Sequence, residues 1–133
     1  MRIKRILQEE PKGCVIACLA MVLGRTYASI REEWQNDFST DGMDTPSFMN
    51  YLGDNGFSII YKAASHYNHK DFAREELLRP FAPVHIICTK PLFDSQHHAM
   101  VMDAKGKIYD PAGRTEDEAR TDYAIVECIG LFR

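Results

Sequence analysis

The amino-acid sequence predicts an α+β fold, in which a helical front half packs on an antiparallel β-sheet formed mainly by the back half. Helical spacing of apolar residues and helix-stop signals fall before residue 57, whereas β-branched and alternating segments fall after it. The chain has 133 residues, which suits a single domain over residues 1–133. Internal repeats and linkers are not recognisable in the sequence.

The front of the chain predicts a buried helix over residues 14–23. Residues 2–7 read as a short strand or an extended lead-in, and Pro11 and Gly13 interrupt the chain after it. Residues 14–23 are apolar on all sides, which is typical of a helix that is buried all round. Gly24 is a natural stop directly after this helix.

Two further helices are expected before the sheet. Residues 29–37 have the apolar spacing of an amphipathic helix. Thr45 and Pro46 read as the N-cap and the first residue of a helix that ends near Leu52. Residues 54–56, with the sequence Asp-Asn-Gly, then form a turn that leads into the first strand.

The back half supplies the expected sheet. The predicted strands cover residues 57–62, 83–89, 97–103, 107–109 and 123–129. The third and fourth strands form a hairpin. A helix over residues 69–78 separates the first two strands, and a short helical turn over residues 116–120 precedes the last one.

Composition and charge exclude several classes of protein. Sixteen basic and nineteen acidic side chains give a net charge of −3, unlike the strongly basic footprint of a general nucleic-acid binder. The longest apolar run, Val15–Leu23, has nine residues, and a bilayer span needs about 20. No signal-peptide cleavage site follows it in register. We therefore expect no nucleic-acid partner, no membrane span and a cytoplasmic location.

The chain has four cysteines: Cys14, Cys18, Cys88 and Cys128. In a reducing cytosol, cysteines are free, metal-bound or catalytic. The only close pair is Cys14 and Cys18, four positions apart, and a zinc site would need a second pair. We expect no metal and no cofactor, and we expect all but Cys14 to be core thiols.

Cys14 is the candidate nucleophile. It lies at or near the start of the buried helix, directly after Gly13. The N-terminal end of a helix carries unpaired N–H groups and a partial positive charge, which favour a thiolate. A neighbouring imidazole would then make this cysteine a working nucleophile. Position alone leaves open the alternative that Cys14 is one more small residue of the core.

Histidine is the candidate base. His97 and His98 open a predicted strand, and alternation places them on opposite faces, so one of them can face a site. An imidazole with a pKa near 6.5 can take a thiol proton and later return it. The sequence does not decide between the two. His85 lies in the middle of a strand, and His66 and His69 are expected to be solvated.

Asp110 and Gln8 are candidates for the supporting roles. Asp110 ends the strand after the histidine hairpin, where its carboxylate can orient an imidazole; the alternative is a turn Asp before Pro111. Gln8 lies six residues before Cys14. Its amide could donate to a developing oxyanion together with the Cys14 backbone N–H. The alternative is a polar residue before a turn.

Four residues with catalytic chemistry follow the order of a papain-like thiol hydrolase: Gln8, Cys14, His98 and Asp110. The segment Gln8-x5-Cys14 with residues 14–23 resembles the active-site segment of the bacteriocin-processing (double-glycine leader) cysteine peptidases, written Q-x5-C-G-x-A-x-L-A-M. Residues 98–102 are similar to the H-[aromatic]-V-V strand of that family, and Asp110-Pro111 matches its D-P. Residues 40–43, 56–57 and 83–85 also resemble it, so the resemblance covers nearly the whole chain.

The resemblance implies a papain-like α+β fold with the cysteine helix packed on an antiparallel sheet. It also implies a role for each of the four residues. Cys14 would be the nucleophile, and His98 the general base and acid. Asp110 would orient the imidazole, and Gln8 would be the oxyanion donor.

Three positions depart from the family pattern. Val15 stands where the family usually has Gly, Gly13 stands where it often has Asp or Asn, and Ala99 replaces an aromatic residue after the histidine. These departures leave the nucleophile and base intact and concern the shape of the substrate cleft. Typical members are domains of membrane ABC transporters that cleave after Gly-Gly. This sequence shows no membrane region, so export-coupled leader cleavage is not carried over.

The leading hypothesis is a stand-alone papain-like cysteine peptidase that hydrolyses a peptide or isopeptide bond. One alternative is a catalytically silent binding or adaptor domain on the same fold, suggested by Val15 and Ala99. Another is an acyltransferase that uses the same triad. The expected partner is a peptide or protein substrate. Recruitment by a separate export protein and the oligomeric state are left open by the sequence.

Overall fold

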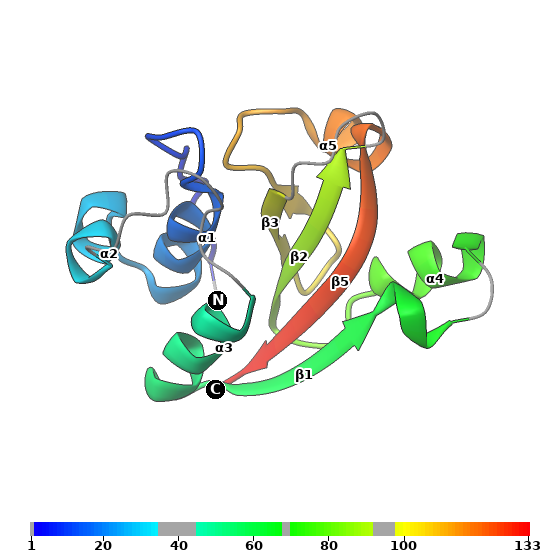
Figure 1. Cartoon of the computed structure of the whole chain (residues 1–133), viewed down its shortest axis with the longest axis horizontal. Helices are drawn as coiled ribbons and strands as arrows, with labels where there is room; N and C mark the ends of the chain where they lie inside the picture. Colours follow the sequence, from blue (N-terminus) through cyan, green and yellow to red (C-terminus); the bar gives the residue numbers. More distant parts are fainter. Residues whose placement is uncertain (1, 35–44, 68–69, 92–97) are drawn as a thin grey trace.

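The computed structural model describes residues 2–34, 45–67, 70–91 and 98–133. The helices are α1 (Cys14–Leu23), α2 (Tyr27–Glu33), α3 (Thr45–Asp54), the short 3-10 helix η1 (Ala64–His66), α4 (Lys70–Leu77) and α5 (Glu116–Asp122). The strands are β1 (Ser58–Ala63), β2 (Val84–Pro91), β3 (His98–Asp103), β4 (Ile108–Tyr109) and β5 (Tyr123–Phe132). Figure 1 shows α1, α2 and α3 on one side of the sheet and α4 on the other. The expected α+β class is confirmed.

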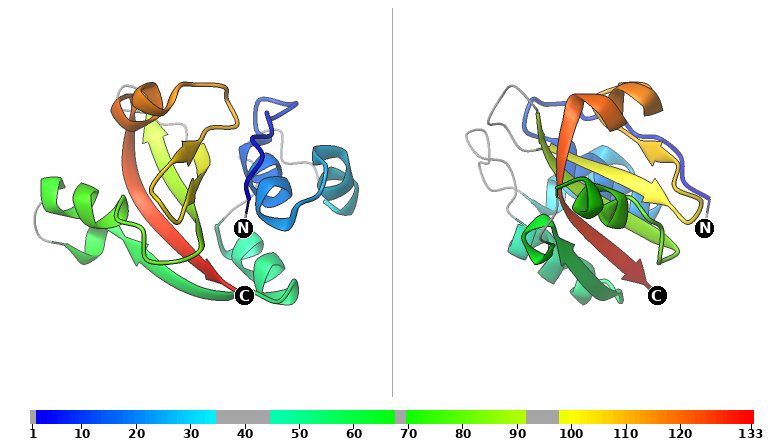
Figure 2. Two further views of the ribbon diagram at one scale, coloured as in Figure 1. Left: turned by 180° about the vertical axis from the view of Figure 1, so that it is seen from behind. Right: turned by 90° about the vertical axis from the view of Figure 1, so that its right-hand side faces the viewer.

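The five strands form one antiparallel sheet in the order β1-β5-β2-β3-β4. β5, the latest strand in the sequence, therefore lies between β1 and β2, as both views in Figure 2 show. The predicted last strand ended at Ile129, but β5 continues to Phe132. It does so because its final residues pair with the beginning of β1, with Phe132 opposite Ser58.

Helix α1 is the buried helix that the sequence predicts, and its bounds agree with the prediction. Its residues 15–22 are all buried. Gly24 ends the helix in the left-handed conformation with φ of 67°, and its N–H donates to the carbonyl of Ala20. A side chain would strain this conformation, which is why glycine is the natural residue at such an end.

The sheet separates two apolar clusters. Ala99 and Val101 of β3 pack with α1 on one face, in the first cluster. Met100 and Met102 pack on the other face with Leu77 of α4, in the second cluster. This alternation is the one expected of the strand that the sequence predicts here. The sheet is therefore covered on both sides, with α1 against β3.

A β-bulge changes the facing of β5 partway along the strand. The register between β2 and β5 shifts by one residue, so Val126 is an extra residue in β5. Ile129 and Leu131, beyond the bulge, pack in the cluster that contains α1. Tyr123 and Ile125, before the bulge, pack in the opposite cluster. One inserted residue moves every following side chain to the other face of a strand.

Some element boundaries differ from the predictions. Residues 2–7 form no strand, which leaves the extended lead-in that the sequence also allowed. Helix α2 begins at Tyr27, two residues earlier than predicted, because the Thr26 hydroxyl caps it by accepting the N–H of Ser29 at 3.1 Å. The predicted end of this helix at residue 37 lies outside the described residues, as do His69 and His97.

His85 is a structural histidine. Its side chain is fully buried, its Nδ1–H donates to the carbonyl of Met102 at 3.1 Å, and its Nε2 accepts the N–H groups of Phe81 and Ala82. Burial lowers the pKa of His85, so the ring is neutral and its hydrogen bonds are satisfied. The Phe81 ring packs edge-on against this imidazole.

Within the described residues, no single helix is long and apolar enough to cross a membrane. Helices α1 and α2 meet the length and composition limits only when they are taken together, and they are bent by 112°.

The contact between Phe81 and the sheet can be tested at Gly130. A Cβ atom at position 130 would lie 2.3 Å from the Phe81 ring, so we expect Gly130→Ala to lower the free energy of unfolding by about 1–3 kcal/mol. The matched control is Gly53→Ala in α3, where a Cβ meets nothing within 4 Å. This control should raise stability by up to about 1 kcal/mol through helix propensity. Urea unfolding measures both, and equal effects would contradict the packing.

Candidate active site

Three of the four sequence-predicted site residues come together at one end of the contact between α1 and β3. Cys14 is the first residue of α1, His98 is the first residue of β3, and Asp110 directly follows β4. Because α1 packs on β3 (Figure 1), the helix brings Cys14 to the start of the strand that carries His98. The histidine hairpin brings Asp110 to the same place.

His98 and Asp110 form a short hydrogen bond. The distance from His98 Nε2 to Asp110 Oδ1 is 2.6 Å, and the two side chains are 10% and 1% exposed. The same oxygen accepts the backbone N–H of Ala112 at 2.8 Å, which fixes the carboxylate in a tight turn. The other carboxylate oxygen, Oδ2, is buried and has no partner among the described residues. A short bond to a buried carboxylate holds the imidazole ring in one orientation.

The His98 imidazole also interacts with the Cys14 thiol. Burial lowers the pKa of His98, but hydrogen bonds to the Asp110 and Cys14 side chains outweigh burial and raise this pKa to about 9. Since Nε2 is bonded to Asp110, Nδ1 is the nitrogen left for Cys14. Cys14 is itself only partly buried. The arrangement allows a proton to pass between a reachable sulfur and an oriented imidazole.

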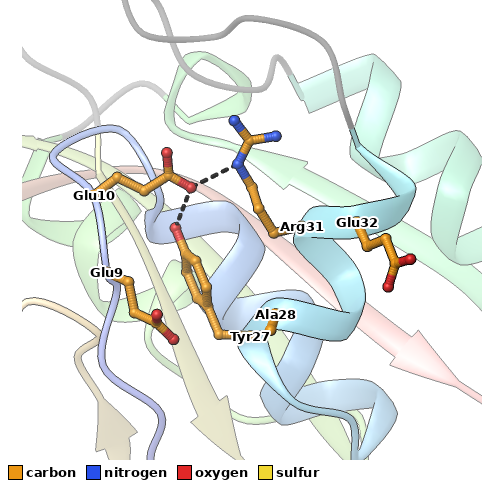
Figure 3. A pocket seen from close by; sticks show the side chains of 6 residues that line it. All are labelled: Glu9, Glu10, Tyr27, Ala28, Arg31 and Glu32. Atoms are coloured by element: carbon orange, nitrogen blue, oxygen red, sulfur yellow. Dashed lines mark hydrogen bonds and ion pairs between the residues drawn. The ribbon is translucent and has the colours of Figure 1, made fainter.

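The loop before Cys14 is held against α2. The Glu10 carboxylate accepts the Tyr27 hydroxyl at 2.8 Å and the Arg31 Nε–H at 2.7 Å, and Figure 3 shows both contacts. A Cβ atom on Gly13 would lie 1.9 Å from the Tyr27 hydroxyl oxygen. Glycine at position 13, one of the departures from the family pattern, is therefore required by this packing. The loop, and Cys14 directly after it, are held in place by side chains of α2.

A surface pocket of about 500 Å³ lies beside this loop. It is lined by Glu9, Glu10, Tyr27, Ala28, Arg31 and Glu32 (Figure 3). Its lining includes neither Cys14 nor His98. The pocket therefore marks the contact between the loop and α2 rather than the contact between Cys14 and His98.

Gln8 lies at the site, but its amide is turned to its own loop. Its backbone N–H donates to the carbonyl of Pro111 at 2.9 Å, next to Asp110. Its side-chain Nε2 donates to the carbonyls of Glu10 at 3.0 Å and Pro11 at 3.2 Å. Both amide hydrogens are thereby used. The role of Gln8 as an oxyanion donor stays a prediction.

Residues 2–8 form a strap along the loop that carries Asp110. Arg5 Nε donates to the carbonyl of Asp110 at 3.2 Å, and Arg5 Nη2 donates to the carbonyl of Arg114 at 3.3 Å. Together with the backbone bond from Gln8 to Pro111, these contacts hold the loop from its outer side. The lead-in thus holds the Asp110 loop in place without joining the sheet.

Tyr123 is a site neighbour that the sequence reasoning missed. Its ring stacks on the His98 imidazole, with 5.0 Å between the ring centroids and 20° between the planes. The only signal in the sequence was an aromatic residue at the start of the last predicted strand. Its facing depends on the bulge at Val126, and local pattern does not reveal such a bulge.

The remaining cysteines are core thiols, as predicted. Cys18 and Cys128 are fully buried and Cys88 is nearly so. Burial raises the pKa of all three, that of Cys128 to about 12, so each stays a neutral thiol. Among the residues that the structure describes, no group of three or more His, Cys, Asp or Glu side chains is placed to hold a metal ion.

The comparisons with known proteins bear on the fold. No protein-family model matches the sequence, and no curated protein matches it. Among solved structures, the chain is similar to the peptidase domain of Streptococcus ComA, a bi-functional ABC transporter involved in a quorum-sensing pathway. The TM-score is 0.64 at 16% identity, and the match covers 98% of each chain. The fold expected from the resemblance to bacteriocin-processing peptidases is therefore confirmed.

The raised pKa of His98 predicts a pH-dependent stability. A group whose pKa is higher in the folded state stabilises the fold fully below its unfolded pKa, about 6.5 for histidine, and loses this effect as pH rises through the folded pKa. We expect the free energy of unfolding to fall between pH 6.5 and about 9, by up to about 3 kcal/mol. Urea unfolding across this range measures it. His98→Gln should lack this slope, and an equal slope in both proteins would contradict the assignment.

Proposed function

We propose that this chain is a stand-alone papain-like cysteine peptidase that hydrolyses a peptide or isopeptide bond. The observation that carries the proposal is the buried His98 imidazole, which is hydrogen-bonded to Asp110 and whose pKa is raised by Asp110 and by the neighbouring Cys14 thiol. The likeness in fold to a solved peptidase domain supports it. All three groups come from one chain with its own core, so the chemistry needs no residue of a partner.

The proposed reaction begins with proton transfer from Cys14 to His98. The Cys14 sulfur attacks the carbonyl carbon of the scissile bond, and the C–N bond breaks as His98 gives its proton to the leaving amine. A thioester joins the acyl part of the substrate to Cys14. His98 then takes a proton from water, the hydroxide attacks the thioester, and the carboxylic acid leaves as the thiol is restored. Asp110 keeps the imidazole in the orientation that both steps need.

The oxyanion would be held at the start of α1. As the first residue of the helix, Cys14 has a backbone N–H without a partner inside the helix, and Gly13 supplies no side-chain cap. Gln8 is proposed as the second donor. Its amide would have to rotate away from the carbonyls of Glu10 and Pro11. Its Oε1 is buried with no partner in the described part of the chain, so the present orientation leaves the amide incompletely satisfied.

A peptide is the substrate class that the proposal takes from the fold relative, which is the peptidase domain of an ABC transporter. The proposal needs no cofactor, because the thiol, the imidazole and the backbone N–H supply the chemistry. A separate export protein as partner and a cytoplasmic location belong to the proposal as well.

The departures that suggested a silent binding domain do not obstruct the site. Val15 is 6% exposed and Ala99 is 2% exposed, and both pack in the cluster of α1 and the sheet. Neither side chain extends from the surface over Cys14. This burial favours the peptidase over the binding domain.

Alkylation tests the activation of Cys14 without a substrate. We expect iodoacetamide at pH 6.5 to label Cys14 alone, since the other three cysteines are buried. His98→Ala should slow the labelling at least tenfold, because the imidazole no longer takes the thiol proton. Mass spectrometry locates the label, and Cys14→Ala is the control. Labelling of Cys14 at an unchanged rate in His98→Ala would contradict the proposal.

Hydrolysis is tested on the purified chain with a peptide library read by mass spectrometry. We expect cleavage that Cys14→Ala abolishes and that Asp110→Asn lowers by about 10²-fold or more, because the imidazole loses its orienting carboxylate. Gln8→Ala should lower the rate by about 10²-fold. An added amine separates hydrolysis from acyl transfer, which would yield an amide product. Rapid labelling of Cys14 with no cleavage of any peptide would instead support the binding domain.

A further inference from the structure

We propose that Tyr123 is a positioning residue for His98: its ring fixes the plane of the imidazole and shields the hydrogen bond to Asp110. This inference rests on the proposed function. The two rings are nearly parallel, with 20° between their planes and 5.0 Å between their centroids. Tyr123 is 6% exposed, so it covers one face of the imidazole as a buried wall.

Tyr123 is itself fixed by contacts from two separate elements. Arg114, in the loop after Asp110, donates from Nε to the Tyr123 hydroxyl at 2.9 Å. Arg74 of α4 donates from Nη1 to the Tyr123 carbonyl at 3.3 Å. The bulge at Val126 turns this part of β5 toward the face on which Tyr123 packs. Because these contacts hold the Tyr123 ring in place, it can restrict rotation of the His98 imidazole stacked on it.

The proposed chemistry makes the plane of the imidazole matter. The His98 imidazole is bonded to Asp110 through Nε2 and also interacts with Cys14, so rotation of the ring about its bond to Cβ would disturb both interactions. A buried aromatic wall removes that freedom and keeps water from the bond to Asp110, and a drier bond is a stronger one. The face of a phenol ring also favours a cation placed on it. Tyr123 therefore favours the protonated, correctly oriented imidazole that the thiolate needs.

A purely structural role makes a different prediction. Tyr123 packs with Ile125, Met100 and Met102 in the second cluster, and loss of a ring from a core lowers stability wherever it occurs. If the role of Tyr123 were purely structural, its replacement would leave the pKa of His98 and the ratio of kcat to KM unchanged. These two quantities therefore decide between the readings.

The experiment compares Tyr123→Leu with the matched control Tyr67→Leu. Tyr67 packs against the same cluster, but its ring contact is with Phe72. We expect Tyr123→Leu to lower kcat about 10-fold or more with KM within about threefold, and to lower the His98 pKa by about half to one unit, read by NMR. Tyr123→Phe, which keeps the ring, should restore most of kcat. Tyr67→Leu should change only the thermal midpoint.

The outcomes separate this inference from the proposed function. If alkylation of wild-type Cys14 is independent of His98, the proposed function fails whatever Tyr123 does. If the wild type is active and Tyr123→Leu matches Tyr67→Leu in kcat and His98 titration, the positioning role is overturned. If Tyr123→Leu does not fold, the NMR spectrum of the wild type still tests the stacking. In the wild type, stacking on the Tyr123 ring should shift the His98 ring protons upfield of those of a histidine in a short unstructured peptide. An unshifted His98 signal would overturn the inference.

Discussion

The buried hydrogen bond between His98 and Asp110 is the constraint around which the surrounding structure is arranged. A carboxylate that is 1% exposed is costly to bury unless polar groups surround it. The N–H of Ala112 and the imidazole supply two of these groups on Oδ1. Arg5 binds the backbone carbonyl of the same residue. The strap, the turn and the start of β3 are all arranged around this one side chain.

The sequence predicted the elements well where local chemistry decides them. The helix from Cys14 was bounded correctly because glycines flank a run that is apolar on all sides. His98 and Asp110 could be paired from the hairpin between them, since hairpin geometry is local. The choice of His98 came from the family resemblance, and the structure places its imidazole against Asp110. These are features that a window of a few residues can contain.

Long-range packing decided what the sequence could not predict. The direction of the Gln8 amide depends on carbonyls in a folded loop, and the start of α2 at Tyr27 depends on which of several polar residues caps it. The facing of Tyr123 depends on a register shift at Val126 that arises only when β5 pairs with β2. Register is set between strands that are far apart in the chain, so periodicity within one strand does not specify it.

The position of β5 in the sheet has a consequence for the timing of activity during synthesis. This strand is made after all the others, yet it lies between β1 and β2, so a partly translated chain cannot join β1 to the part of the sheet that β2, β3 and β4 form. Contacts across such long sequence separations form late in folding. The thiol of Cys14 leaves the ribosome long before its histidine partner is in place. On the proposed function, a chain that still lacks β5 also lacks the Tyr123 ring that covers His98, so the complete site exists only after this last strand has been made.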